Sequence, residues 1–166
     1  MSAAEPQSGS VPIPVSRSPA PRVLLAEDSR TCQEFVRIVM KQSGLDLDIV
    51  SNGVEAIEAL AKSDYALVLM DCLMPVMGGA ETTRLIRSGA TNARNPDIPI
   101  IAITANAFQA NADACKLAGM NDYMTKPVSA AALRAVTLKW LAAEPQFEEA
   151  DQMAYCSTPE FTTGAG

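Results

Sequence analysis

Short apolar runs alternate with amphipathic stretches through most of the chain. Runs that read as strands occupy residues 23–26, 47–50, 66–70, 100–103 and 123–124. An amphipathic stretch with helical spacing follows each run, including one with Cys32, Phe35, Val36, Val39 and Met40 and one with Leu133, Val136, Thr137, Trp140 and Leu141. The runs at 66–70 and 100–103 are apolar at every position, which is typical of parallel strands covered on both faces. The pattern therefore predicts five strand–helix units and an α/β fold with a parallel sheet.

The fourth predicted helix, from Phe108 to Ala118, differs from the others in composition. It consists mostly of Ala, Asn and other small or polar residues and has few large apolar side chains. Because such a helix buries little apolar surface, we expect it to pack weakly and to be a moving part of the fold.

The two ends of the chain lack the periodic pattern. Residues 1–21 are rich in Ser and Pro, a composition that favours extended, solvated chain, and we interpret them as a flexible leader. Residues 144–166 are acidic with isolated aromatics, and we interpret them as a flexible tail. The folded domain is predicted to span 22–143.

Composition and charge exclude several classes of function. The 166 residues contain 13 Lys plus Arg against 19 Asp plus Glu, and this net charge of −6 disfavours nucleic-acid binding. The absence of histidine excludes imidazole catalysis and histidine phosphorylation within the chain. No apolar run is long enough to span a membrane. The four cysteines form no CxxC pair and read as free thiols, which favours a reducing, cytoplasmic location.

Chemically active side chains follow directly after the predicted strands. Glu27 and Asp28 end the first strand, Asp71 the third and Thr104 the fourth, while Lys126 follows the fifth. Because ligands of open parallel sheets gather at the carboxyl ends of the strands, we expect these side chains to converge. Clustered carboxylates favour a cation with oxygen ligands such as Mg²⁺. Asp71 is then a candidate nucleophile toward phosphorus.

At these positions the sequence resembles the receiver domains of two-component response regulators, above all those of hybrid sensor histidine kinases. The matching stretches are Val23–Ser29 (VLLAEDS), Met70–Gly79 (MDCLMPVMGG), Ile103–Ala107 (ITANA) and Ala118–Val128 (AGMNDYMTKPV). The resemblance covers about residues 22–141 and implies a flavodoxin-like (βα)5 fold, with a five-stranded sheet in the order 2-1-3-4-5 between two layers of helices.

The resemblance also implies a phosphoacceptor site that depends on Mg²⁺. Asp71 corresponds to the phosphoacceptor and Asp28 to a direct metal ligand, while Glu27 reaches the metal largely through water. The backbone carbonyl of Leu73 corresponds to a further ligand. The phosphoryl donor would be a phosphohistidine on a sensor histidine kinase or a histidine phosphotransfer protein, and the output would be altered binding to a downstream protein.

Three further residues complete the implied site, and two of them, Thr104 and Tyr123, form its switch. Thr104 would move its hydroxyl onto the phosphoryl group, Lys126 would pair with that group, and Tyr123 would change between outward and inward positions. The Lys126–Pro127 bond is implied to be cis. Gly78 departs from the family pattern, which commonly has Asp there, and the loop from residue 89 to 97 is longer than the family's. Leu73 and Asn106 occupy the positions that govern water access to the acyl phosphate.

Other interpretations compete with this one. Taken alone, Glu27 and Asp28 could simply cap the first helix, and Tyr123 could be a half-buried core residue. A phosphohydrolase with an Asp nucleophile commonly needs a second Asp shortly after the first, and Asp71-Cys72-Leu73 lacks one. We therefore predict a signalling phosphoacceptor and not an enzyme that turns over substrate. A degenerate receiver that only binds proteins is disfavoured because every site position is filled. Whether the chain is a stand-alone regulator or part of a hybrid kinase stays open.

Overall fold

Five strands alternate with five helices in the part of the chain that the structure describes. The structure is a computed structural model and describes residues 20–105 and 109–143. The strands are β1 (Arg22–Ala26), β2 (Asp46–Val50), β3 (Leu67–Asp71), β4 (Ile100–Thr104) and β5 (Asp122–Thr125). The helices are α1 (Arg30–Gln42), α2 (Gly53–Lys62), α3 (Gly79–Arg87), α4 (Gln109–Leu117) and α5 (Ala130–Ala142). The five predicted strand–helix units are confirmed.

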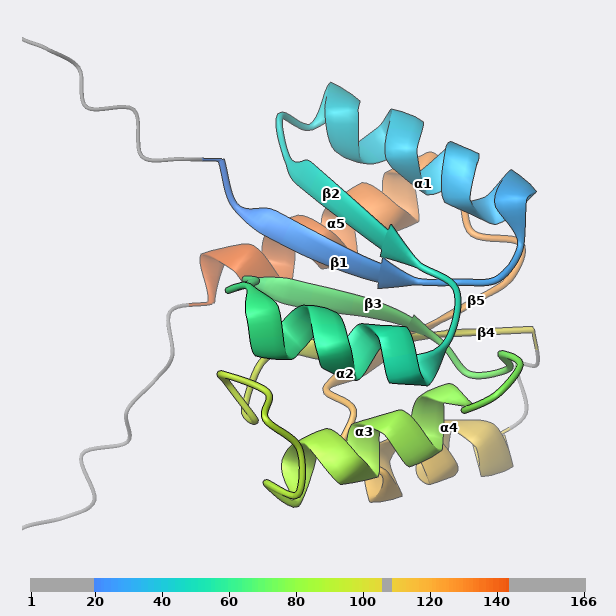
Figure 1. The fold of residues 1–166 in the computed structure, drawn as a ribbon. Helices are drawn as coiled ribbons and strands as arrows, with labels where there is room; N and C mark the ends of the chain where they lie inside the picture. Colours follow the sequence, from blue (N-terminus) through green and yellow to red (C-terminus); the bar gives the residue numbers. More distant parts are fainter. Residues whose placement is uncertain (1–19, 106–108, 144–166) are drawn as a thin grey trace, which may run out of the picture.

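The strands form one parallel sheet in the order β2-β1-β3-β4-β5. Helices α1 and α5 cover one face, and α2, α3 and α4 cover the other (Figure 1). The sequence therefore predicted both the strand order and the layers correctly. All five residues of β3 and of β4 are buried, as continuous apolar runs in a covered sheet require.

Alternate residues of each strand enter two separate cores. Leu24, Val68 and Met70 point toward α2, α3 and α4, whereas Leu25 and Leu69 point toward α1 and α5. This alternation is the period-two geometry of a strand, and it fixes the register because a one-residue slip would exchange the two faces.

The helices bury most of the residues that their spacing predicts, but Phe35 of α1 and Val54 of α2 are exposed. Leu133 and Thr137 of α5 are buried, and Val136, Trp140 and Leu141 are partly buried. In α1, Val36, Val39 and Met40 are buried, but Phe35 is 36% exposed. Phe35 stays at the surface because it lines a cleft between α1 and α5 that no other part of the described chain fills.

Arg87 ties together three segments at the end of the sheet where the strands begin. Its guanidinium donates to the carbonyl of Gly119 at 2.9 Å, to Asn121 Oδ1 at 2.8 Å and to the carbonyl of Pro96. Asn121 Oδ1 also accepts from the backbone N–H of Ile100 at 2.8 Å. This network anchors the long loop before β4. The sequence showed the length of this loop but not the contacts that hold it.

Both ends of the described chain lie at that same end of the sheet, away from the strands' carboxyl ends (Figure 1). The predicted leader and tail fall outside the described residues, as do Asn106 and Phe108, so those expectations stay predictions. Among residues 20–105 and 109–143, none of the helices combines the length and apolar character that crossing a bilayer requires.

Candidate functional site

Three carboxylates gather at the carboxyl ends of β1 and β3. One carboxylate oxygen from each of Glu27, Asp28 and Asp71 lies within 4.8 Å of the other two. Glu27 and Asp71 are buried and Asp28 is exposed, so the cluster opens to solvent on one side. The convergence expected from the sheet topology is confirmed for these three side chains.

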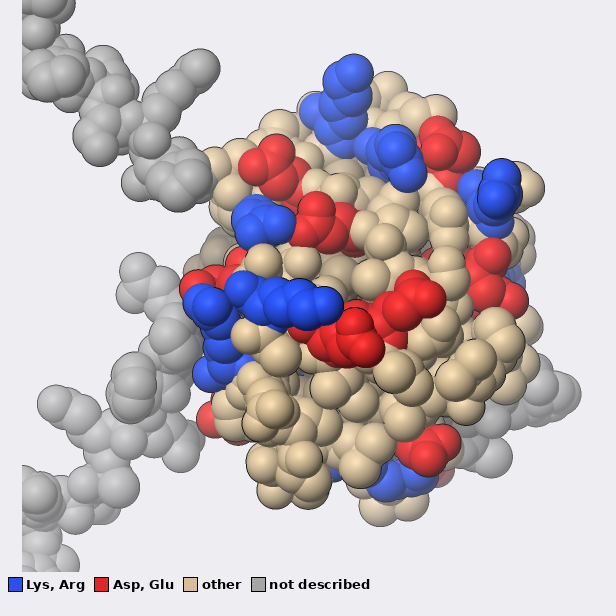
Figure 2. All heavy atoms as spheres, in the orientation of Figure 1, with Lys and Arg blue, Asp and Glu red and all other residues tan. Residues whose placement is uncertain are grey.

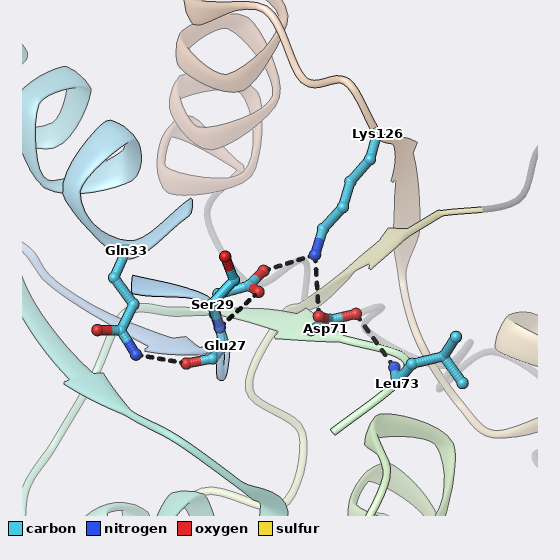
Figure 3. Close-up of polar contacts among 6 residues, drawn as sticks. All are labelled: Glu27, Ser29, Gln33, Asp71, Leu73 and Lys126. Carbon is cyan, nitrogen blue, oxygen red and sulfur yellow. Dashed lines mark hydrogen bonds and ion pairs between the residues drawn. The ribbon is translucent and has the colours of Figure 1, made fainter. Parts of the chain in front are cut away.

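Lys126 joins the two buried carboxylates. Its Nζ lies 2.8 Å from Glu27 Oε2 and 2.9 Å from Asp71 Oδ2 (Figure 3). Burial alone would lower the pKa of Lys126, but the hydrogen bonds to Glu27 and Asp71 and their negative charge together hold its pKa above the usual value. Lys126 is therefore a permanent cation at the centre of the cluster. The Lys126–Pro127 peptide is cis, as the resemblance implied.

Glu27 is almost completely buried and is held from several sides. Its Oε1 accepts from the backbone N–H of Ser29 at 3.1 Å, and its carbonyl accepts from Gln33 Nε2 at 2.6 Å. Burial raises the pKa of Glu27; its hydrogen bond to Lys126 opposes this shift, and the charge of Asp71 adds to it. Ser29 is the N-cap of α1 and makes no side-chain cap hydrogen bond. The N-cap position of α1 is thus Ser29, and neither Glu27 nor Asp28 occupies it.

Asp71 ends β3 with both carboxylate oxygens engaged. Oδ1 accepts from the backbone N–H of Leu73 at 3.1 Å, and Oδ2 accepts from Lys126. The side chain of Leu73 is 73% exposed and points away from the carboxylate (Figure 3). Sequence reasoning missed the role of the Leu73 N–H because a backbone donor leaves no side-chain signal. The ligand role of the Leu73 carbonyl stays a prediction.

The two proposed switch residues occupy different environments. Thr104 ends β4, is buried and makes a hydrogen-bonding contact with Cys72. Tyr123 on β5 is 43% exposed, and its role as a switch stays a prediction. Thr104 lies on the strand next to Asp71, since Asp71 pairs in register with Ile103.

The start of α3 presses against the backbone of Asp71. The N–H of Gly79 donates to the carbonyl of Cys72 at 3.2 Å. A Cβ added to Gly79 would lie 2.3 Å from the carbonyl oxygen of Asp71, whereas one added to Gly78 would approach no closer than 3.2 Å to the carbonyl of Cys72. Only glycine fits at position 79, and this contact fixes where β3 presents its terminal carboxylate.

A pair of thiols lies below the carboxylates. The Sγ atoms of Cys72 and Cys115 are 3.7 Å apart, although 43 positions separate them in sequence. Burial raises the pKa of the Cys72 thiol to about 12, and the neighbouring Cys115 and Asp71 act in the same direction. Sequence analysis assigned the cysteines no site, because nothing in their spacing placed these two together.

The raised pKa of Cys72 predicts a loss of stability at alkaline pH. The unfolded thiol ionises near its usual value of 9.0, whereas the folded thiol stays protonated until about pH 12. Between these values the folded state binds more protons, so this contribution to stability is complete below pH 9 and declines as the pH rises. We expect the thermal midpoint to fall from pH 9 to 11 less steeply in Cys72→Ala than in the native protein. Thermal unfolding followed by circular dichroism measures the thermal midpoint at each pH, with Cys32→Ala as the matched control. Equal slopes of midpoint against pH in Cys72→Ala and the native protein would contradict the prediction.

An apolar cleft adjoins the carboxylate cluster. It encloses about 580 Å³ between α1 and α5, with walls that include Phe35, Val128 and Leu133 and an inner end at Glu27 and Lys126. On the face drawn in Figure 2, acidic and basic side chains are interspersed and form no extended basic area.

Comparison with known proteins gives one consistent result. The family model described as response regulator receiver domain matches residues 23–137. Histidine kinase 5 of Arabidopsis thaliana is 37% identical over 150 residues, which cover 76% of this chain and 16% of the relative. Sensor protein GacS of Pseudomonas syringae pv. syringae is 35% identical over 127 residues, which cover 76% of this chain and 14% of the relative. The chain thus spans about one sixth of the length of these relatives.

A solved structure shares both the fold and much of the sequence. The receiver domain of sensor histidine kinase PA1611 from Pseudomonas aeruginosa PAO1, with a magnesium ion coordinated in its active site cleft, is 35% identical. The match has a TM-score of 0.65 and covers 74% of this chain and 98% of that one. The receiver domain of a histidine kinase from Syntrophus aciditrophicus is 27% identical with a TM-score of 0.67, over 82% of this chain and 100% of that one.

Proposed function

The chain belongs to the response regulator receiver domain family of two-component systems, and we propose that it accepts a phosphoryl group from phosphohistidine onto Asp71. The observation that carries this proposal is the buried Asp71 carboxylate, bound by Lys126 and flanked by two further carboxylates. Residues 22–143 form the proposed receiver domain. The segments 1–21 and 144–166 are proposed to lie outside it as leader and tail.

The donor set fits Mg²⁺. Three carboxylates within 4.8 Å of one another offer only oxygen ligands, and the single ammonium of Lys126 does not balance their charge. We assign Asp28, Asp71 and the Leu73 carbonyl as direct ligands and Glu27 as a ligand acting largely through water. When bound, the ion supplies positive charge that offsets the negative oxygens of the incoming phosphoryl group.

The chain's own residues account for the transfer. A carboxylate oxygen of Asp71 attacks phosphorus while the P–N bond of the donor breaks and the imidazole keeps the electron pair, so an acyl phosphate forms. Lys126 already contacts Asp71, and it exchanges part of this ion pair for the new phosphoryl oxygens. The N–H of Leu73 holds the remaining carboxyl oxygen in place.

Phosphorylation then changes the surface that a partner meets. The added negative charge draws in the Thr104 hydroxyl, and the partly exposed Tyr123 moves inward. Helix α4 adjoins both of these strands and adjusts with them. We propose a downstream protein as the reader of this change.

The chain is proposed to be a signalling phosphoacceptor and not a phosphohydrolase. Leu73 is exposed beside Asp71 and carries no group that could orient or deprotonate a water molecule. Hydrolysis of the acyl phosphate therefore lacks a dedicated acid or base at this position, which favours a state that lasts long enough to signal.

The phosphoryl donor is proposed to be a sensor histidine kinase or a histidine phosphotransfer protein. The cleft between α1 and α5 supports this partner, because it offers an apolar docking surface whose inner end reaches the carboxylate cluster. We also propose a cytoplasmic location, supported by the three free thiols among the described residues.

Removal of the metal tests the proposed function. We expect incubation with acetyl phosphate and Mg²⁺ to add one phosphoryl group, and a chelator to lower the labelling at least about tenfold, because the clustered carboxylates then repel the donor. Intact-mass spectrometry measures the adduct, with a known receiver labelled in parallel as the control. Equal labelling with and without Mg²⁺, or none while the control is labelled, would contradict the proposal.

A further inference from the structure

Cys72 and Cys115 meet directly below the candidate site, and the phosphoryl chemistry uses neither. Cys72 follows Asp71 at the end of β3, and Cys115 lies on α4 with its Sγ at 3.7 Å from that of Cys72. Cys115 is 5% exposed, while Cys72 is only partly buried. Both thiols thus belong to the packed region between the sheet and α2, α3 and α4.

We propose that Cys72 and Cys115 are a redox modification site, where a hydroperoxide joins them in a reversible disulfide that ties α4 to the end of β3. The sulfur atoms are in contact at 3.7 Å and must approach to about 2.05 Å, the length of a disulfide bond. No intervening side chain has to leave, since the two sulfurs already face each other.

The chemistry balances with a hydroperoxide as the oxidant. Because its raised pKa keeps the Cys72 thiol protonated at neutral pH, the attack comes from the small thiolate fraction and is slow. The thiolate attacks the O–O bond and takes one oxygen to become a sulfenic acid, and the alkoxide that leaves takes the thiol proton and becomes the alcohol. The thiol of Cys115 then attacks that sulfur, so that the S–S bond forms and water leaves. Two thiols lose two electrons in total, and the hydroperoxide is reduced to an alcohol and water. Thiol–disulfide exchange with a cellular dithiol reverses the bond.

Helix α4 is the part that moves to close the gap. Cys72 is fixed through its backbone, because its N–H donates to the carbonyl of Ile103 at 3.0 Å and its carbonyl accepts from Gly79. On the α4 side, Cys115 and Ala118 are buried but Leu117 is 85% exposed, so little apolar surface holds the described part of this helix.

The bond would affect signalling through two contacts, and this consequence rests on the proposed function. Cys72 also contacts Thr104, the residue proposed to respond to the phosphoryl group. A disulfide would therefore alter the surroundings of Thr104 and hold α4 against the sheet at the same time. The oxidised protein would still accept the phosphoryl group but would transmit it less well to α4.

Peptide mapping tests the disulfide itself. The full chain, and a variant with Cys32→Ser and Cys156→Ser, are treated with hydrogen peroxide, digested without reduction and analysed by mass spectrometry. We expect a peptide pair joined through Cys72 and Cys115 in most molecules, abolished by dithiothreitol and absent in Cys115→Ser. Free thiols, sulfinic acid at Cys72 without a cross-link, or cross-links only between molecules would overturn the proposal.

The signalling consequence has a separate readout. Amide NMR shifts of residues 113–118 are compared with and without Mg²⁺ and beryllofluoride in the reduced and the oxidised protein. We expect the shift changes to be at least about twofold smaller after oxidation, because the disulfide restrains α4. Equal shift changes in the reduced and the oxidised protein would overturn the proposed restraint of α4. Asp71→Asn should form the same cross-link, because Asp71 takes no part in the oxidation. The peptide map therefore tests the disulfide even if the proposed phosphoacceptor function is wrong.

Discussion

Replacing Asp71 with asparagine will abolish phosphoryl incorporation, lowering it at least about a hundredfold below the native protein. The carboxamide is nearly the same size but lacks the nucleophilic carboxylate, and no other described acidic side chain has the same contacts with Lys126 and the Leu73 N–H. The fold should persist, because Lys126 keeps its ion pair with Glu27 and one of the three clustered carboxylates is gone. Intact-mass spectrometry after incubation with acetyl phosphate and Mg²⁺ measures the loss.

A distant acidic residue provides the control for Asp71. Asp64 is exposed and pairs with Arg94 at 3.0 Å at the opposite end of α2 from the site, so Asp64→Asn should be labelled like the native protein. Continued labelling of Asp71→Asn, with the phosphoryl group mapped to Glu27 or Asp28, would show that the acceptor had been assigned to the wrong carboxylate.

Replacing Gly79 with alanine will destabilise the protein by about 2–3 kcal/mol. The new Cβ would stand 2.3 Å from the carbonyl oxygen of Asp71 and 3.1 Å from its carbonyl carbon, so either α3 or the end of β3 must shift. Alanine gains at most about 1 kcal/mol in helix propensity, which does not offset a clash with backbone atoms. Chemical denaturation measures the change, and slower labelling of Asp71 should accompany it because the carboxylate is displaced.

The neighbouring Gly78 gives a matched comparison. Its added Cβ would lie 3.2 Å from the carbonyl of Cys72, a tight contact that a small adjustment relieves, and its φ of −76° suits any residue. Gly78→Ala should therefore cost less than about 1 kcal/mol. Equal losses of stability for the two variants would mean that the close approach of α3 to Asp71 does not constrain the site.

The fold could be predicted from the sequence because its signals are local and repeated. The apolar runs at 66–70 and 100–103 became β3 and β4 with boundaries shifted by at most one residue. The strand order came from the resemblance and not from periodicity, since apolar spacing does not say which strands are neighbours. Phe35 was misplaced because helical spacing shows which residues share a face but not where an adjoining helix leaves a cleft.

The site was predictable only where side-chain chemistry coincides with a strand end. Glu27, Asp28 and Asp71 met as expected because the carboxyl ends of parallel strands share an edge. The double ion pair of Lys126 requires distances that sequence does not contain. Three further features depend on backbone position or on contacts between distant segments, and no sequence motif predicts them. They are the hydrogen bond from the Leu73 N–H, the fit of Gly79 against Asp71 and the contact between Cys72 and Cys115.

The placement of the two described ends makes the domain easy to embed in a longer polypeptide. Chain enters at β1 and leaves after α5 at one end of the sheet, and the carboxylate cluster opens at the other (Figure 1). A neighbouring domain or a fused reporter joined at either point would therefore lie next to the end of the sheet that is opposite the carboxylate cluster. An attachment at either end therefore starts from the side of the sheet opposite the acceptor, an arrangement suited to insertion into longer proteins.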